Sequence, residues 1–150
     1  PPLNYPWVHQ LKRDFPDLTI VINGGIETLE ACEQQLEHVD GVMLGRAAYQ
    51  NPWLLSGVDA RLFEANATVG STREQVIETM LPYIEKQLSE GARLHHVTRH
   101  MLGLYQGQYG GRQYRRHLSE HAYKTEAGVA TLLEAAAFCA APPERAVALG

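Results

Sequence analysis

The sequence predicts an α/β fold that gives way to an all-α fold, namely the C-terminal end of a (β/α)8 TIM barrel followed by a helical bundle domain. Two apolar runs, within residues 18–32 and 40–50, each end at a glycine and then change to helical spacing. No further strand-like run of any length follows them. We assign residues 1–57 to the end of the barrel, with its last two strands, and 58–150 to a connector and the helical domain.

The composition is that of a globular chain. Of its 150 residues, 45% are hydrophobic and 20% are charged, which is enough apolar material for a buried core. No apolar run approaches the roughly 20 residues that cross a bilayer, and no basic-then-apolar leader opens the sequence. We therefore expect a cytoplasmic protein with no membrane partner.

The first part of the chain predicts a helix followed by a β-α-β unit. A helix with apolar residues at helical spacing ends before Pro16, and the residues 18–22 (LTIVI) then predict a buried strand. Residues 27–39 predict a second helix, with Glu27 and Glu30 near the positive end of its dipole. Residues 41–44 (GVML) predict another short buried strand. Strands joined through a helix are expected to pair in parallel.

The second part predicts helices only. Residues 56–70 look like an irregular connector, and Ser71 to Glu74 form a capping-box pattern that opens a long apolar helix. Pro82 is expected to kink this helix and Gly91 to end it. Further helices are predicted over residues 92–105, 112–122 and 128–139.

The barrel assignment follows from the number of strands. Two parallel strands do not form a stable sheet by themselves, and parallel sheets occur in α/β proteins whose two faces are covered. A (β/α)8 barrel takes roughly 250 residues, so the missing strands are expected to come from elsewhere. The two strands here would then be the seventh and the eighth.

Two glycine junctions predict a phosphate site. Loops after the seventh and eighth barrel strands often bind phosphate, and here they hold Asn23, Gly24 and Gly25 in one loop and Gly45 with Arg46 in the other. Glycine lets backbone N–H groups approach an anion, and arginine adds a charged fork. The alternative for Asn-Gly is a hairpin turn, but that needs an antiparallel strand where residues 27–39 have helical spacing.

One strongly basic block lies in an otherwise acidic chain of net charge −4. Residues 91–124 hold six of the thirteen lysines and arginines and five of the seven histidines, against Glu120 alone. Arg112, Arg115 and Arg116 are spaced to lie on one side of a helix. Such a cluster suits RNA, while the alternative is a solvated face that pairs with the acidic first half. Composition leaves both readings open.

Several other side chains suggest chemistry less strongly. His96 and His100 have the spacing of zinc ligands, but no HExxH glutamate or third ligand accompanies them, so we expect no metal. Cys32 and Cys139 each lie at helical apolar spacing and suggest neither a disulfide nor a metal site. The tyrosines near the basic block either pack around neighbouring glycines or contact RNA, and the pattern does not decide between these: Tyr105, Tyr109 and Tyr114.

Three motifs, INGGI, DGVMLGRAAYQNPWLL and TRHMLGLYQGQYGGRQYRRHLSEHA, closely resemble the C-terminal part of tRNA-dihydrouridine synthases of the A subfamily. The resemblance runs from Pro2 to about residue 140. It implies a flavoprotein oxidoreductase, monomeric as a full-length enzyme, that reduces D-loop uridines of tRNA with FMN and NADPH. It also implies that the C-terminal helical domain helps to hold the tRNA.

The resemblance assigns residues to both sites. Asn23, Gly24 and Gly25 match the family's FMN-phosphate loop, and Gly45 with Arg46 matches its second phosphate-binding turn. Arg112 and Arg115 match the arginines with which the family contacts tRNA. A shift of the alignment by one residue between Gly111 and Arg116 would assign Arg116 instead of Arg115.

The catalytic residues of the family have no match in this chain. The family's proton-donating cysteine, and a lysine and a histidine near the flavin, lie on earlier barrel strands and loops. Neither Cys32 nor Cys139 is placed for that role, so we assign no catalytic residue and expect no activity from this segment alone. Two alternatives are a helical RNA-binding module without catalysis and another phosphate-binding barrel enzyme.

Overall fold

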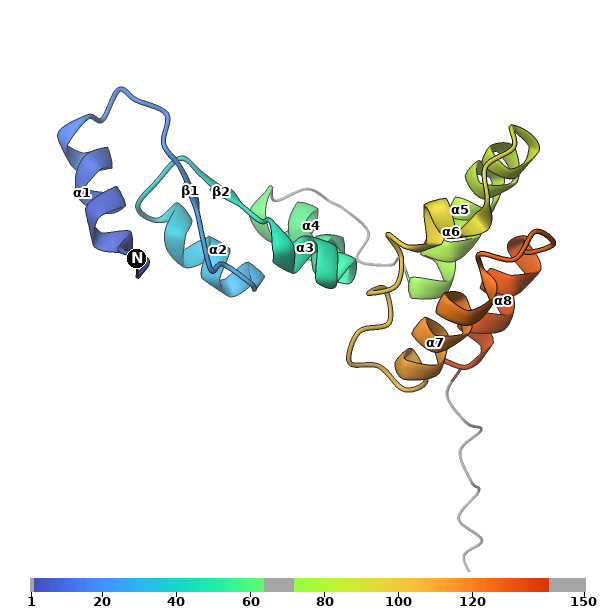
Figure 1. Ribbon diagram of the computed structural model, residues 1–150. Helices are drawn as coiled ribbons and strands as arrows, with labels where there is room; N and C mark the ends of the chain where they lie inside the picture. Colours follow the sequence, from blue (N-terminus) through green and yellow to red (C-terminus); the bar gives the residue numbers. More distant parts are fainter. Residues whose placement is uncertain (1, 64–71, 141–150) are drawn as a thin grey trace, which may run out of the picture. The chain divides into compact units, whose positions relative to one another are not determined.

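The computed structural model describes residues 2–63 and 72–140, which divide into two compact units, Pro1–Ser71 and Thr72–Gly150 (Figure 1). The described part of the first unit contains a small sheet with helices. That of the second unit is helical. No helix in these described ranges is both long enough and apolar enough to cross a bilayer.

The sheet of the first unit is a parallel pair, as the sequence predicts. Strand β1 (Val21–Asn23) pairs with β2 (Gly41–Met43), with Val21 opposite Gly41 and Asn23 opposite Met43. Both strands are shorter than predicted, since residues 18–20 and 44 lie outside them. The predicted full burial is wrong: Ile22 is 2% exposed, but Val21 and Met43 are 57% and 53% exposed. In the described residues each strand pairs only with the other, so the outer edge of each strand has no partner strand.

Two predicted helices flank the sheet. Helix α1 (Tyr5–Asp14) begins after an Asn4 cap, and α2 (Leu29–Leu36) begins after Thr28, whose hydroxyl accepts from Ala31 N at 3.1 Å. Glu30 lies in the first turn of α2, as predicted, where its charge favours the helix dipole. The core of this unit consists of Ile22, Ile26, Cys32 and Val39.

Asp40 ties α1 to the sheet just before β2. Its carboxylate accepts hydrogen bonds from Ile20 N at 2.8 Å and from Lys12 Nζ at 2.9 Å, and its own N–H donates to Ile20 O at 3.0 Å. Lys12 Nζ also donates to Leu18 O at 2.9 Å. The Ile20 N–H and then Lys12 lower the pKa of the Asp40 carboxyl, so it stays charged and keeps these contacts at neutral pH.

The segment after β2 is more helical than predicted. It runs through α3 (Arg46–Gln50), the 3-10 helix η1 (Pro52–Gly57) and α4 (Val58–Leu62). The predicted connector is therefore wrong for residues 58–62, because Arg61 of α4 forms ion pairs with Glu30 and Glu33 of α2 and so gives this turn a packing partner. Residues 64–70 of that connector lie outside the described residues.

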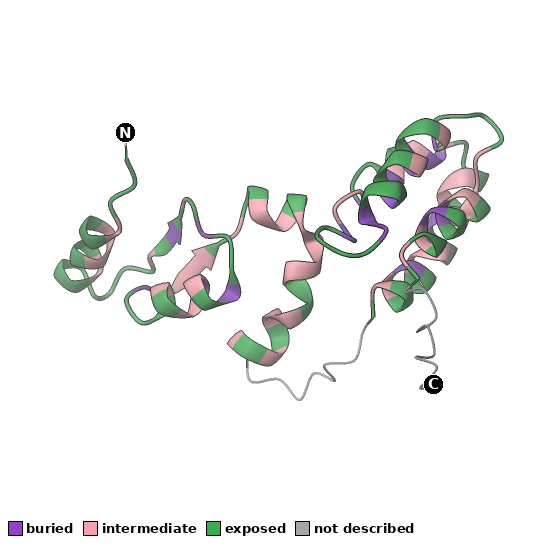
Figure 2. Ribbon diagram, turned by 90° about the horizontal axis from the view of Figure 1, so that it is seen from below, coloured by how far each residue is buried: buried purple, intermediate pink, exposed green. Residues whose placement is uncertain are grey.

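Four helices form the described part of the second unit: α5 (Arg73–Ser89), α6 (Leu94–Thr98), α7 (Gly111–His121) and α8 (Val129–Ala137). Each has buried positions, and Figure 2 shows buried segments among the exposed ones in this unit. The large side chains of this core are Ile77, Ile84, Leu94, Met101, Leu104, Tyr105, Tyr114, Leu118 and Leu132.

The start of α5 lies one residue from its predicted place. Thr72 is the cap, its hydroxyl accepting from Gln75 N at 3.2 Å while Gln75 Oε1 accepts from Thr72 N at 2.8 Å. The predicted capping residue, Ser71, lies outside the described residues. Helix α5 continues through Pro82, and Gly91 follows its end with φ +93°, which confirms the predicted stop.

The predicted helix over residues 92–105 is wrong after Thr98. From there the chain forms successive turns, such as Met101 N to Thr98 O and Leu104 N to Met101 O. Arg73 Nε donates to Leu104 O at 2.8 Å, and Gln108 N donates to Tyr105 O instead of to Leu104 O. The turns satisfy the backbone locally while Met101, Leu104 and Tyr105 enter the core, so tertiary packing overrides helical spacing.

Gly111 allows α7 to start against these turns. A Cβ at Gly111 would lie 2.2 Å from the backbone oxygen of Tyr105, whereas a Cβ at Gly128 would meet nothing within 4 Å.

We expect Gly111→Ala to lower the free energy of unfolding by about 3 kcal/mol, since backbone cannot move aside as a side chain can. Gly128→Ala is the control, with a loss of at most about 1 kcal/mol from a poorer helix cap. Urea denaturation checks this, and equal losses for the two variants would contradict it.

Candidate phosphate pocket and basic helix

The parallel register brings the two glycine junctions to one edge of the sheet. Because Asn23 and Met43 are paired at the strand ends, the loops that follow them start side by side. Together they line a pocket with a volume of about 270 Å³. All five residues of the predicted phosphate site line it: Asn23, Gly24, Gly25, Gly45 and Arg46.

The backbone of the first loop is shaped for close approach. Gly24 and Gly25 have φ values of +119° and +63°, which residues other than glycine rarely adopt. Within the described residues, the N–H groups of Gly25 and Ile26 make no hydrogen bond. This loop therefore offers unpaired backbone donors beside the pocket.

The second loop adds space and positive charge. A Cβ built on Gly45 would meet nothing within 4 Å, so the absent side chain leaves room at the pocket wall. Arg46 is exposed and lines the pocket, and its side chain has no ion pair or hydrogen bond in the part of the chain that the structure describes. The guanidinium is thus available to an anion.

Sequence reasoning did not assign several residues at this pocket, among them Ile26 and Ala47, which also line it. Glu27 and Met43 line it, and the Tyr5 hydroxyl donates to Gly24 O at 2.6 Å from the start of α1. The position of Met43 follows from the strand register, but Glu27 was explained by the helix dipole alone. No local pattern links Tyr5 to a loop 19 residues away. Glu27 places a negative charge next to an otherwise anion-binding wall.

The lining of the pocket can bind an anion, and its only acidic side chain among the described residues is Glu27. Cys32 lies on α2 with 1% of its surface exposed, and burial raises the pKa of its thiol. A buried neutral thiol cannot reach a ligand at the loops.

Helix α7 carries the predicted RNA-binding arginines on its exposed side. Tyr114 and Leu118 turn into the core at 0% and 2% exposure, which directs Arg112, Arg115 and Arg116 outward. Arg116 Nε donates to Glu120 Oε1 at 2.7 Å, one helical turn away. Arg112 and Arg115 have no such partner among the described residues. The structure therefore separates one engaged arginine from two available ones.

The tyrosines near α7 divide into two kinds. Tyr105 and Tyr114 pack against each other with ring centroids 4.9 Å apart and are buried, donating to Glu74 Oε1 and to Met101 O. Burial raises the pKa of both hydroxyls, so they remain neutral donors. Tyr109 is 64% exposed. Of these three tyrosines, it alone is accessible for stacking on an RNA base.

The histidines of residues 95–100 are arranged around helix α6. His95 and His96 lie edge to face with centroids 4.2 Å apart, and Arg99 Nε donates to His100 Nε2 at 3.0 Å. Over residues 2–63 and 72–140, no three histidine, cysteine or acidic side chains gather as a metal site would require.

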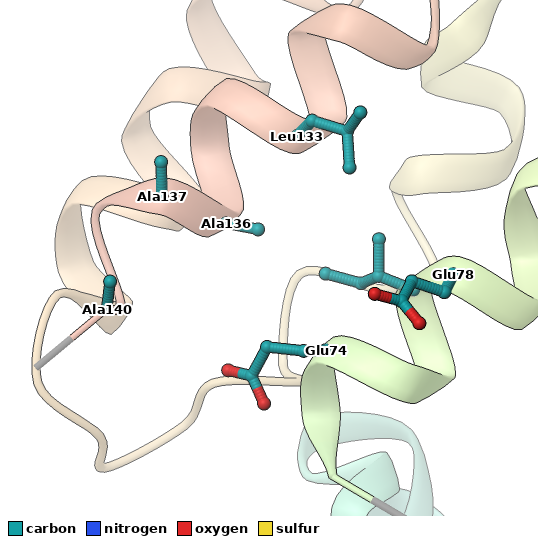
Figure 3. Close-up of a pocket in the computed structure, with 7 residues that line it drawn as sticks. Glu74, Glu78, Leu133, Ala136, Ala137 and Ala140 are labelled. Carbon is teal, nitrogen blue, oxygen red and sulfur yellow. The ribbon is translucent and has the colours of Figure 1, made fainter.

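A second hollow lies between α5 and α8 (Figure 3). It has a volume of about 430 Å³. Glu74 and Glu78 form one wall, and Leu133 with Ala136, Ala137 and Ala140 forms the other, as the close-up shows. An acidic and apolar lining does not suit a phosphate, so the RNA-binding candidates remain on α7.

Comparison with known proteins points to one family. A family model described as dihydrouridine synthase (Dus) matches residues 1–141. A tRNA-dihydrouridine(20/20a) synthase of Yersinia pestis is 57% identical over 91% of this chain and 39% of its own length. Enzymes of the same name from Vibrio cholerae and Pasteurella multocida are 54% and 55% identical, over 91% and 93% of this chain and 42% of each relative.

The chain thus spans about two fifths of the length of these relatives. The match is continuous across both units, and it includes the pocket loops and helix α7. On these grounds the chain belongs to the dihydrouridine synthase family.

Proposed function

We propose that this chain is the C-terminal portion of an FMN-dependent tRNA-dihydrouridine synthase that reduces D-loop uridines with NADPH in the cytoplasm. In this proposal the first unit ends a TIM barrel and the second unit helps to bind tRNA. The observation that carries it is the convergence of Asn23, Gly24, Gly25, Gly45 and Arg46 on one pocket. The relatives' printed name, tRNA-dihydrouridine(20/20a) synthase, supplies the product, dihydrouridine in tRNA.

The residues present fit the phosphate of FMN. Unpaired N–H groups at Gly25 and Ile26 would donate to its oxygens, and Arg46 would add a charge-assisted hydrogen bond. The open space at Gly45 admits the phosphate close to the backbone. Bound FMN would supply the hydride, while these residues hold the cofactor in place. The proton donor would come from another part of the enzyme.

Helix α7 would bind the sugar-phosphate backbone of the tRNA through its arginine side chains. Arg112 and Arg115 are exposed and unpaired among the described residues, so they can reach phosphates without first breaking an ion pair. Arg116 would have to leave Glu120. We therefore assign tRNA binding first to Arg112 and Arg115 and only secondarily to Arg116.

Expression of the full-length enzyme tests the proposal directly. The purified protein should be yellow and should release FMN on denaturation. A colourless protein that binds no added FMN, but still binds tRNA, would support the RNA-binding module instead. A protein that binds phosphate compounds without binding tRNA would support another barrel enzyme.

Arg46→Ala should weaken FMN binding in that enzyme by roughly 10- to 100-fold, because a hydrogen bond to a charged group contributes about 1.5–3 kcal/mol. Affinity for tRNA should change little. Flavin fluorescence on titration of the apoenzyme measures the first quantity and filter binding the second. Arg13→Ala, which removes an exposed guanidinium elsewhere in the first unit, is the matched control. A loss of tRNA affinity with FMN binding intact would contradict the assignment.

Glu27→Gln should strengthen FMN binding about two- to fivefold at low salt, since it removes a negative charge from the pocket wall. The gain should shrink as ionic strength rises, because the site is open to solvent. Glu37→Gln makes the same change in charge at an exposed position outside the pocket and should have no effect. Equal effects of the two substitutions would show that only net charge matters.

Arg112→Ala and Arg115→Ala should each weaken tRNA binding several-fold and reduce the slope of log affinity against log salt by roughly 0.7–0.9, the contribution of one phosphate contact. Arg116→Ala should have a smaller effect, because Glu120 already engages its guanidinium. Measurement of tRNA affinity between roughly 50 and 300 mM salt, where counterion release dominates the salt dependence, distinguishes the three variants. A larger slope change for Arg116→Ala would refute this ranking.

A further inference from the structure

Tyr5 contacts the first glycine loop from outside it. Its hydroxyl donates to Gly24 O at 2.6 Å, across 19 residues of sequence. The residue is half-buried at the start of α1, and its ring packs against the core of the first unit. A Cβ built on Gly25 would lie 3.3 Å from the same hydroxyl oxygen, so this hydroxyl borders both glycines.

This hydrogen bond determines the orientation of a peptide that borders the pocket. The chain has no cis peptide bond among its described residues, and in a trans peptide the carbonyl and the following N–H point in opposite directions. Holding Gly24 O toward Tyr5 therefore directs the Gly25 N–H away from Tyr5. Two adjacent glycines would otherwise leave this peptide free to rotate, because glycine has access to both signs of φ.

We propose that Tyr5 is a positioning residue for the phosphate site: its hydroxyl holds the Gly24–Gly25 peptide so that the Gly25 N–H is set in advance to donate to a phosphate oxygen. This inference rests on the proposed FMN function of the pocket. It extends that function to a residue outside both loops. The stabilisation comes from order in the free protein, since a donor already in place need not be immobilised when the ligand binds.

Ring and hydroxyl have separable tasks. The ring supports α1 against the core, whereas the hydroxyl contacts only the loop. Tyr5→Phe keeps the ring and removes the hydrogen bond, so it changes the loop and leaves the packing. The predicted defect is therefore specific for the phosphate group of a ligand.

Comparison of FMN with riboflavin, the same ring system without phosphate, isolates that defect. In the full-length apoenzyme, Tyr5→Phe should weaken FMN binding about three- to tenfold, the range of one neutral hydrogen bond. Riboflavin affinity and the melting temperature of the apoenzyme should stay near those of the wild type. Tyr123→Phe, which removes the hydroxyl of an exposed tyrosine in the second unit, should change neither affinity.

Three results would overturn the inference. Unchanged FMN affinity in Tyr5→Phe, while the wild type prefers FMN over riboflavin, would refute the role of Tyr5 and leave the proposed function intact. Equal weakening of FMN and riboflavin would show a general structural role. A wild-type apoenzyme that binds both flavins equally would refute the phosphate pocket itself, and the role of Tyr5 with it.

Discussion

The parallel register between β1 and β2 is the constraint on which the pocket depends. A slip of one residue would move one loop by about 3.3 Å along the sheet and turn the side chains of that strand to the other face. With only three residues in each strand, the ladder alone is a weak determinant of register. Asp40 supplements it, because its backbone and side chain both bond to Ile20 while Lys12 binds the same carboxylate. Charge and backbone thus align the loop after Met43 with the loop after Asn23.

Much of the first unit could be predicted because its signals are local. The change from apolar run to glycine to helical spacing gave the order of elements, and parallel pairing followed from the helix between the strands. Strand burial was overestimated, since Val21 and Met43 have covering partners only if other strands and helices pack on them. Tyr5 was missed for a different reason: a single hydroxyl that reaches across a fold leaves no periodic trace in the sequence. Periodicity shows which face is buried, but it does not show which polar atom meets which.

The second unit shows where helical spacing misleads. Residues 99–105 carry apolar side chains at helical intervals, yet they form turns, because Arg73 and Tyr105 make contacts with partners that lie far away in the sequence. The same turns bring the backbone of Tyr105 against Gly111, which only glycine permits at the start of α7. Helix α7 was predictable, since Tyr114 and Leu118 mark its inner face. What sequence could not show was that Glu120 engages one of the three arginines and leaves two free.

In the proposed function, the phosphate pocket and helix α7 have the same kind of role. Each would hold the non-reacting phosphates of a larger ligand, while the proton donor would come from another part of the enzyme. Binding energy from such remote groups is useful to catalysis when it orients a reacting ring, because orientation converts a bimolecular encounter into a reaction within one complex. In this proposal, a pocket that held the FMN phosphate would determine where the flavin ring lies. A basic helix that held the tRNA backbone would determine how the uridine approaches the ring. In this view the chain positions both partners, and the residues that transfer the proton need only meet them.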